Sequence, residues 1–357
     1  MKCEKFVVVH LITSLGEGGA EKNLFLSVKH TPKYQHVVWA VYGGHYVDMI
    51  DVLPNAKVFF GVFSLIQLIM FIRGRAAAFF LWMYYAQCMA PLIRLFRPTD
   101  KIIFLIRTSL PKVTASLPLK VACRLSRGTS RYADSFLACG ERCGLEHLNY
   151  WGKSHYPVTV ISNFSSPAYS PKRKFEDSLR KRLKNRFVIA CVARNDPQKG
   201  HQILIEAIRL FVDKIDESVI VLCAGRNTQE LSRVYSRIEI IGLGVGWNLK
   251  DIASVSDIHC SSSLDGEGFQ NSILELLHYG CFSIATDIGE ASNLVVDREF
   301  IVPPGSPSLL SEALQYYFRY RENDCVRKKW LKKKSTISNK YSDKSAIEGW
   351  TDFLETL

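Results

Sequence analysis

Short apolar runs alternate with longer segments of helical spacing along the whole chain. Runs rich in Val, Ile and Phe predict buried strands, and the amphipathic segments between them predict helices. This alternation is typical of α/β domains built on parallel sheets. In the first half the predicted strands lie near residues 6–12, 36–42, 76–82, 102–106, 135–138 and 157–161.

The pattern stops at a Ser- and Pro-containing stretch, 165–171, and at the charged stretch 172–186 that follows it. We place a domain boundary there, which gives a first domain of residues 1–164 and a second of residues 165–342. The last segment, 343–357, is predicted to be a helix that packs back on the first domain. Predicted strands of the second domain lie near 187–193, 219–224, 238–241, 258–261 and 283–285, with a helix from Gln202.

Length and charge agree with two domains of different character. The chain has 357 residues, 47% of them hydrophobic, which is enough for two cores. Residues 1–164 hold 19 Lys and Arg against 9 Asp and Glu, whereas the remainder holds 27 against 25. A basic first domain predicts an anionic surface or substrate. It carries no aromatic-laced binding motif, so no nucleic acid partner is expected.

The ten cysteines are scattered, without a C-x-x-C pair or a His partner at zinc-like spacing. Cys191, Cys223 and Cys260 stand in apolar runs and are predicted to be buried free thiols. This indicates a reducing compartment and no metal site. The apolar run 6–15 follows Glu4 and leads into a Gly-rich loop, so we interpret it as a first strand, not as a signal peptide.

The segment Asp265-Gly-Glu-Gly-Phe-Gln-Asn-Ser-Ile-Leu-Glu275 places two carboxylates, Glu267 and Glu275, eight positions apart. A glycine-containing loop here runs into a helix that is predicted to end at Gly280, with Asn271 and Ser272 as possible caps and Glu275 two turns in. Free N–H groups at such a helix start suit a diphosphate. The spacing alone fits better with a helix cap and a solvated Glu than with a binding site.

The neighbouring residues form a longer motif. The stretch EGFQNSILELLHYGCFSIATDIGE resembles the signature of the family 4 retaining glycosyltransferases, EGF-x-N-x-x-L-E-A-x-x-x-G followed by a strand ending A-T-D-x-G. It departs from that pattern at Leu276, where Ala is usual, and at Phe282, where Pro is usual. The matching residues are Glu267, Gly268, Phe269, Asn271, Leu274, Glu275, Gly280, Ala285, Thr286, Asp287 and Gly289.

Three further segments resemble the same family. They are Gly18-Gly19-Ala20-Glu21, the segment 160–163 and the segment 192–201. The resemblance implies a GT-B architecture, in which two Rossmann-like domains face across a cleft and the second binds most of the donor. No cofactor or metal is expected.

The resemblance also implies roles for single residues. Arg194 and Lys199 would neutralise a diphosphate leaving group, although both also fit a solvated basic loop. Glu275 would bind the ribose hydroxyls, and Glu267 would contact the transferred sugar. Other donor-binding residues would be Gly18, Gly19, Gly268, Phe269, Gln270 and Asn271.

One position departs from the family in a way that affects chemistry. Many relatives read W-M-Y-H-A where this chain has Trp82-Met83-Tyr84-Tyr85-Ala86. Tyr85 can hydrogen-bond a sugar hydroxyl but supplies no imidazole chemistry near neutral pH. Arg107 and Ser109 match the next family segment and would line the acceptor side. The alternative for both is a polar residue at a strand end.

Two features predict contact with an anionic membrane. Residues 58–72 are nearly all apolar but too few to span a bilayer, which takes ~20 residues. If helical, they suit an interfacial position, or alternatively a helix packed on the sheet. Basic side chains at helical spacing, and the amphipathic basic run 327–334, would add attraction for anionic headgroups. The spaced residues are Lys120, Arg124, Arg127 and Arg131.

Together these features predict a cytoplasmic enzyme, peripheral on the cytoplasmic face of the inner or plasma membrane. It would be a retaining hexosyl- or N-acetylhexosaminyltransferase that uses a nucleotide-sugar, most simply a UDP-sugar. The expected acceptor is a polyprenyl-diphosphate-linked or growing glycan in surface polysaccharide or lipopolysaccharide biosynthesis. A sugar-nucleotide epimerase of the same fold and a non-catalytic nucleotide-binding scaffold remain as alternatives.

Overall fold

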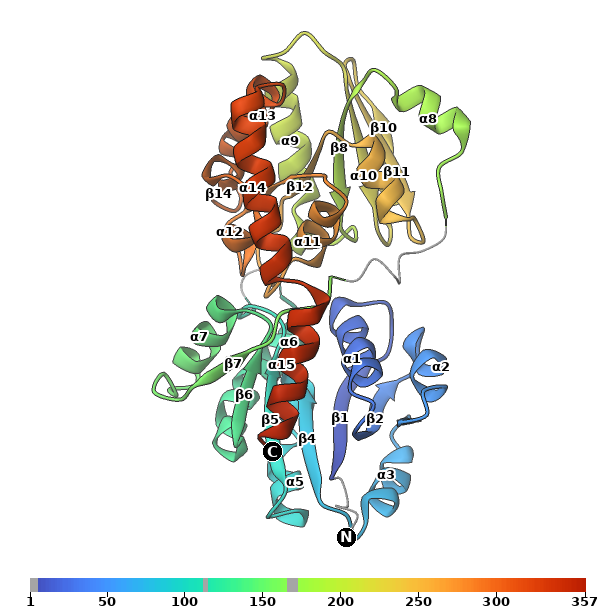
Figure 1. Cartoon of the computed structure of the whole chain (residues 1–357), viewed down its shortest axis with the longest axis vertical. Helices are drawn as coiled ribbons and strands as arrows, with labels where there is room; N and C mark the ends of the chain where they lie inside the picture. The colour runs from blue at the N-terminus through green and yellow to red at the C-terminus, as the bar shows by residue number, and fades with distance from the viewer. Residues whose placement is uncertain (1–5, 112–114, 166–172) are drawn as a thin grey trace. The chain divides into compact units, whose positions relative to one another are not determined.

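The computed structural model describes residues 6–111, 115–165 and 173–357, and these form two α/β units (Figure 1). The first unit contains residues up to Phe164 together with 343–357, and the second contains 165–342 apart from the residues not described. Each unit has its own sheet flanked by helices. The predicted fold class, two Rossmann-like α/β domains, is confirmed.

The first unit contains a parallel sheet in which the described strands follow the order β3-β2-β1-β4-β5-β6-β7. Every pairing in it is parallel, as expected for strands that are apolar on both faces. The strands are β1 (Val7–Ser14), β2 (Gln35–Tyr42), β3 (Ala56–Phe60), β4 (Ala77–Trp82), β5 (Lys101–Ile106), β6 (Ser135–Ala138) and β7 (Val158–Val160).

Helices α1 and α15 lie on one face of this sheet (Figure 1). The ring of Trp350 on α15 stacks on Trp82 of β4 at 6.2 Å, so the C-terminal segment belongs to the core of this unit. The helices are α1 (Gly19–His30), α2 (Tyr46–Asp51), α3 (Ser64–Ile72), α4 (Met83–Gln87), α5 (Ala90–Phe96), α6 (Leu117–Thr129), α7 (Glu141–Tyr150) and α15 (Asp343–Glu355).

The apolar run 58–72 is not one helix. It begins inside β3, turns at Gly61 and continues as α3. Hydrophobicity alone does not distinguish a buried strand from a helix, and here one run contains both. Of the four basic residues at helical spacing, Lys120, Arg124 and Arg127 lie on α6. Arg131 lies beyond the end of that helix, in the 3₁₀ turn η1 (Ser130–Tyr132). None of the described helices has the length and hydropathy needed to cross a membrane.

The second unit has a sheet whose described strands follow the order β10-β11-β9-β8-β12-β13-β14. All pairs are parallel except β10 with β11, an antiparallel edge hairpin. The strands are β8 (Phe187–Val192), β9 (Val219–Ala224), β10 (Arg233–Val234), β11 (Ile238–Gly244), β12 (Ile258–Ser261), β13 (Ser283–Thr286) and β14 (Ile301–Val302).

Helices cover this second sheet, and the charged stretch after residue 172 contributes one of them. Phe175 lies just before α8 and Leu183 is its last residue, and both are buried in the core of the second unit. The helices are α8 (Asp177–Leu183), α9 (His201–Val212), α10 (Leu249–Val255), α11 (Asn271–His278), α12 (Ala291–Leu294), α13 (Pro307–Tyr320) and α14 (Asp324–Lys340).

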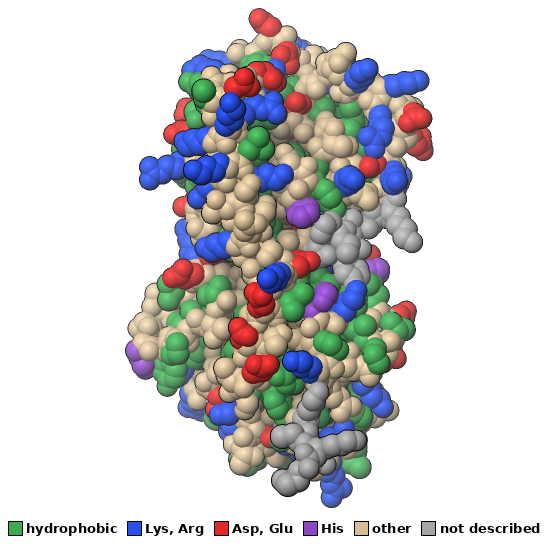
Figure 2. All heavy atoms as spheres, viewed as in Figure 1, with side chains coloured by type: hydrophobic (Ala, Val, Ile, Leu, Met, Phe, Trp, Pro, Cys, Tyr) green, Lys and Arg blue, Asp and Glu red, His purple; other side chains and the backbone are tan. Residues whose placement is uncertain are grey.

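The basic run 327–334 lies on α14, and its aromatic residue is not a membrane anchor. Trp330 is completely buried, packs against Phe300 at 5.1 Å and donates its indole N–H to Asp297 Oδ2 at 2.7 Å. The surrounding Lys and Arg side chains face solvent, over the part of the second unit where Figure 1 places α13 and α14 (Figure 2). The amphipathic interpretation of this run is therefore wrong, whereas its basic surface is real.

Candidate functional site

In the second unit, β8 and β12 are neighbours from which the chain leaves in opposite directions. From β8 the chain continues to β9 on one side, and from β12 it continues to β13 on the other. Open α/β sheets bind ligands at the carboxyl ends of two such strands. The loop 193–200 follows β8 and the loop 262–270 follows β12, so both predicted motifs emerge at this edge.

The two loops meet in an ion pair. Lys199 Nζ donates a hydrogen bond to Glu267 Oε1, and the same oxygen accepts a hydrogen bond from Ser263 Oγ at 2.7 Å. The side chains of Lys199 and Glu267 are only 18% and 13% exposed. Charge-assisted hydrogen bonds in such a setting hold a carboxylate in a fixed position. Thr286 Oγ1 donates to Ser263 O at 2.6 Å and so fixes the loop from the adjacent strand.

Further hydrogen bonds join the same loops. Leu264 N donates to Gln198 O at 2.7 Å, and Ser262 Oγ donates to Lys199 O at 2.9 Å. Gln198 Nε2 also donates to the buried carboxylate of Asp265 at 3.2 Å. The loops therefore form one hydrogen-bonded surface beside Glu267.

Gly200 is required at the point where these loops cross. Its φ is 61°, in the left-handed region, and a Cβ atom there would stand 2.2 Å from the carbonyl oxygen of Ser262. Only glycine meets both conditions without strain. The motif therefore requires Gly200 for a steric reason, in addition to Lys199 for its charge.

Arg194 takes a different position from Lys199. Its guanidinium donates to Asp196 Oδ2 at 3.1 Å and to Gln198 Oε1 at 3.2 Å, and about half of the side chain is exposed. Burial opposes ionisation of Asp196, but the Gln198 backbone N–H and then Arg194 hold the pKa of that carboxyl below its ordinary value. Arg194 is thus oriented by its own loop and keeps an open side toward solvent.

His201, the first residue of α9, connects the loop to the sheet. Its Nε2 lies 3.0 Å from the carbonyl oxygen of Arg194, and its Nδ1 lies 3.6 Å from Cys191 Sγ. Cys191, Cys223 and Cys260 are all free and buried, which confirms that prediction. The imidazole thus joins the loop 193–200 to β8, a role that the motif alone did not indicate.

The helix after Glu267 does not begin where the sequence predicts. α11 starts at Asn271, so Gln270 is the cap, and its side chain makes no capping bond. Asn271 and Ser272 therefore lie inside the first turn, and the capping prediction is wrong. Glu275 lies four residues after the start, about one turn in instead of two, and is partly exposed. The predicted stop is confirmed, since Gly280 has a φ of 92° two residues after the helix ends.

The middle of the motif is buried. The ring of Phe269 packs edge-on against Tyr341 at 5.4 Å, and Gly268 O accepts a hydrogen bond from Glu290 N at 3.1 Å. Within the described part of the chain, neither amide atom of the buried Gln270 side chain has a hydrogen-bond partner. The donor-binding roles of Gly268, Phe269 and Gln270 stay predictions.

In the first unit, the predicted residues lie at the carboxyl edge of its own sheet. Gly18 caps α1 and Gly19 begins it, after the short loop 15–17 that follows β1, while Tyr85 lies on α4 directly after β4. β1 and β4 are again neighbours from which the chain leaves in opposite directions. Met83 has a φ of 67°, rare for a non-glycine residue, and Tyr85 is 44% exposed. Strain of this kind is frequent at functional sites.

Arg107 and Ser109 are more enclosed than a strand-end position suggests. The Arg107 guanidinium stacks on Trp82 and Trp350, and its Nη1 donates to Asn163 Oδ1 at 3.1 Å. Its Nε and Nη2, and Ser109 Oγ, are buried without a hydrogen-bond partner among the described residues. Burial lowers the pKa of Arg107. Their role toward an acceptor stays a prediction.

Sequence reasoning missed Ser263 and the pairing of Lys199 with Glu267. The signal for Ser263 was the polar run 261–263 directly after a buried strand, where side chains face the ligand edge. Among the described residues, no group of three or more His, Cys, Asp and Glu side chains is arranged to hold a metal ion.

Residues 186–319 match the family model described as Glycosyl transferases group 1. This stretch includes Arg194, Lys199, Glu267 and Glu275. The match lies within the second unit.

Two curated proteins are similar to part of the chain. Phosphatidyl-myo-inositol mannosyltransferase of Mycobacterium leprae is 24% identical over 144 residues, which are 38% of this chain and 37% of that protein. Glycogen synthase of Lactiplantibacillus plantarum is 28% identical over 149 residues, 39% of this chain and 31% of that protein. The chain spans about a third of the length of these relatives.

The crystal structure of Anabaena Alr3699/HepE in complex with UDP and glucose is similar over the full length. It superposes with a TM-score of 0.78 at 17% identity, covering 99% of this chain and 100% of that one. At this identity the likeness shows the fold, which is GT-B.

Proposed function

We propose that the protein is a retaining glycosyltransferase that moves a sugar from a nucleotide-sugar to a glycan acceptor. The observation that carries the proposal is the Lys199–Glu267 pair at the carboxyl edge of β8 and β12. It places a cation for a diphosphate beside a fixed carboxylate for a sugar, inside the stretch that matches Glycosyl transferases group 1.

In this proposal the donor diphosphate lies against Arg194 and Lys199. Negative charge grows on the leaving diphosphate as the bond between its oxygen and the anomeric carbon breaks, and two preorganised cations stabilise it. Glu267, held by Lys199 and Ser263, stabilises the positive charge that develops on the sugar. The acceptor hydroxyl attacks from the leaving-group face, and its proton passes to a phosphate oxygen. Positioning and electrostatics thus supply most of the catalysis.

Uridine diphosphate is the nucleotide that we propose. It is supported by the Anabaena protein, whose crystal structures contain UDP and UDP-glucose. Glu275, one turn into α11, would accept hydrogen bonds from the ribose hydroxyls. We further propose that Arg194 and Lys199 take the place of a metal ion.

From the first unit we propose that Gly18 and Gly19 present backbone N–H groups to substrate and that Tyr85 hydrogen-bonds a sugar hydroxyl. The exposure of Tyr85 and the strained Met83 beside it support a functional role for this turn. A phenol both donates and accepts, so it preserves binding where an imidazole is lost.

We propose a lipid-linked acceptor and contact with an anionic membrane on its cytoplasmic face. Support comes from exposed apolar side chains on and beside α3, with Phe63 90% exposed and Ile66 66% exposed. On α6, Arg124 and Arg127 are exposed beside Val121 and Leu125. Insertion of apolar side chains and attraction of basic side chains to anionic headgroups both strengthen binding to an anionic membrane. Surface polysaccharide assembly is the setting that such an acceptor suggests.

The test of the enzymatic proposal is turnover with UDP-glucose and UDP-N-acetylglucosamine in the presence of a membrane lipid extract. Release of UDP with a glycosylated lipid, whose new linkage keeps the donor's anomeric configuration, is expected. Inversion of that configuration would contradict the retaining mechanism. Epimerised UDP-sugar without transfer would support the epimerase instead, and UDP binding without any turnover would support the scaffold.

Flotation with vesicles tests the membrane proposal. The chain should float with vesicles rich in anionic lipid at low salt, and the double substitution F63S/I66S should abolish this. The matched control is Val234→Ser, because Val234 is 76% exposed but lies in the second unit. Equal flotation of F63S/I66S and wild type would contradict the role of α3.

A further inference from the structure

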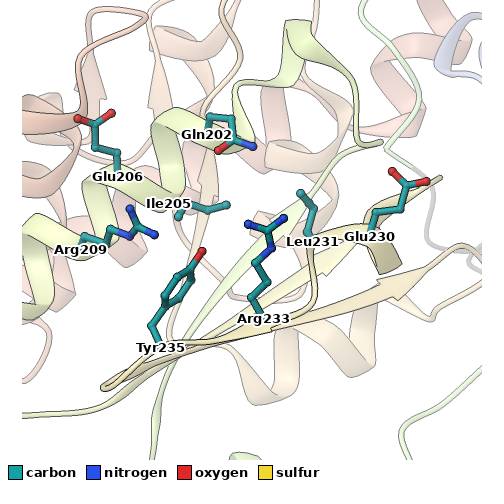
Figure 3. A pocket seen from close by; sticks show the side chains of 8 residues that line it. All are labelled: Gln202, Ile205, Glu206, Arg209, Glu230, Leu231, Arg233 and Tyr235. Atoms are coloured by element: carbon teal, nitrogen blue, oxygen red, sulfur yellow. The ribbon is translucent and has the colours of Figure 1, made fainter.

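A pocket of about 300 Å³ lies in the second unit between α9, the 3₁₀ turn η4 (Thr228–Leu231) and β10 (Figure 3). Its α9 residues lie at positions 202, 205, 206 and 209, a repeat of three and four that places them on one face of that helix. None of its residues belongs to the site described above. It is lined by Gln202, Ile205, Glu206, Arg209, Glu230, Leu231, Arg233 and Tyr235.

Two arginines and a tyrosine give the pocket its chemistry. The Arg209 guanidinium lies 4.6 Å from the centre of the Tyr235 ring. Hydrogen bonding from Arg233, and then from Arg209, lowers the pKa of Tyr235. Figure 3 shows both guanidinium groups and the phenol hydroxyl pointing toward the middle of the pocket.

The two carboxylates of the pocket form no ion pair with these arginines. Glu206 and Glu230 lie at the two ends of the pocket (Figure 3), and the described residues include no ion pair to Arg209 or Arg233. Two guanidinium groups without a carboxylate partner are suited to an anion, and guanidinium geometry matches phosphate. Ile205 and Leu231 add an apolar wall, and Gln202 adds an amide that donates and accepts.

The pocket is connected to the loop that carries Arg194 and Lys199. Asn195 Nδ2 donates to Glu230 Oε2 at 3.4 Å and to Asn227 O at 3.3 Å. α9 itself begins directly after this loop. A ligand that draws α9 and η4 together therefore acts on both ends of the loop.

We infer that this pocket binds a small phosphorylated sugar or polyol and that its occupancy changes nucleotide affinity at the Lys199–Glu267 site. A volume of about 300 Å³ lies at the lower end of the range for small-molecule pockets. The binding part stands by itself, whereas the coupling part rests on the proposed function. Coupling between sites is reciprocal, so UDP must change the affinity of the phosphate ligand by the same factor.

Calorimetric titration of the full chain tests the binding part, with glucose 6-phosphate, inorganic phosphate and gluconate as probes. Glucose 6-phosphate should bind, inorganic phosphate more weakly, and gluconate, a carboxylate of similar size, at least tenfold more weakly. Arg209→Gln and Arg233→Gln should each weaken glucose 6-phosphate binding at least tenfold. Arg319→Gln, which removes an exposed charge from α13, should not.

The binding part would be overturned by unchanged glucose 6-phosphate affinity in R209Q and R233Q, or by competition of UDP for the same site. The phosphate assignment would be overturned if gluconate bound as tightly as glucose 6-phosphate. The second measurement is UDP affinity with and without saturating glucose 6-phosphate. A change of about fivefold or more in wild type, absent in R209Q, is expected. Binding of glucose 6-phosphate without such a change would overturn the coupling alone. Failure of UDP to bind at all would count against the proposed function and leave the pocket's ligand established.

Discussion

Lys199 and Glu267 form an ion pair although 67 residues separate them in the chain, and Ser263 donates a second hydrogen bond to the same carboxylate oxygen. The pair exists because β8 and β12 are adjacent in the sheet, so that the loops after them meet. It unites a cation suited to a diphosphate with a carboxylate suited to a sugar.

The ion pair should contribute differently to folding and to binding. Lys199→Met leaves Glu267 mostly buried without its partner and should lower the free energy of unfolding by about 2 kcal/mol. The double substitution K199M/E267Q removes both charges and should recover most of that loss, but not UDP affinity. Denaturant unfolding and UDP titration of wild type, K199M and K199M/E267Q measure both effects. If K199M/E267Q bound UDP like wild type, the pair would have only a structural role.

Gly200→Ala should be far more disruptive than alanine at another glycine of positive φ. At Gly200 a Cβ atom meets the Ser262 carbonyl oxygen at 2.2 Å, whereas at Gly246, with a φ of 87°, it meets nothing within 4 Å. G246A should therefore cost only the backbone strain, about 1 to 2 kcal/mol. G200A should cost several kcal/mol by the same denaturant measurement and also weaken UDP binding. Equal losses would mean that the crossing of the two loops adapts freely.

Substitutions on α14 separate a core residue from a surface one. Trp330→Ala removes a fully buried indole and should lower the free energy of unfolding by about 3 to 5 kcal/mol. Leu331→Ala, one position later and half exposed, should stay within about 0.5 kcal/mol. Thermal or chemical unfolding of both variants measures this. A mild effect at Trp330 would contradict its place in the core.

Protonation of His147 should destabilise the first unit at low pH. Its Nδ1 lies 2.8 Å from Cys143 O and its Nε2 lies 2.7 Å from the Tyr84 hydroxyl, so the neutral ring fits between them. Burial lowers the pKa of His147 to about 4. Because the unfolded chain binds this proton at higher pH, stability is full above about pH 6.5 and falls between there and about pH 4, on the order of 3 kcal/mol.

His147→Gln tests this pH dependence. The variant should be less stable at pH 8 but should show a shallower decline between pH 6.5 and 4, measured by urea unfolding at each pH. His278→Gln, at an exposed position of α11, is the control and should keep the wild-type slope. An unchanged slope in H147Q would assign the acid sensitivity to other groups.

The sequence predicted the sheets because strands such as 187–192 and 219–224 are apolar throughout, as is typical of parallel sheets. It did not predict β3, since residues 58–72 are apolar across a strand, a turn and a helix. It also misjudged Trp330, because a basic run gives no sign of which side chain faces inward. These errors arise where burial depends on tertiary packing and not on local pattern.

The sequence named candidate residues for the site but not their contacts. Arg194, Lys199, Glu267 and Glu275 were named from their motifs. Lys199 contacts Glu267, whereas Arg194 donates hydrogen bonds to Asp196 and Gln198. These contacts depend on the geometry of the loops, which residue spacing does not predict. The helix start at Asn271 was likewise set by the loop, since Gln270 caps the helix without a side-chain bond.

The most direct test of the central claim is calorimetric titration of UDP into the wild-type chain, Lys199→Met, Arg194→Gln and Arg319→Gln. If the edge of β8 and β12 binds the diphosphate, K199M and R194Q should each lose at least tenfold in affinity, about 1.4 kcal/mol, while R319Q stays at the wild-type value. Equal UDP affinity in all four proteins would contradict the account.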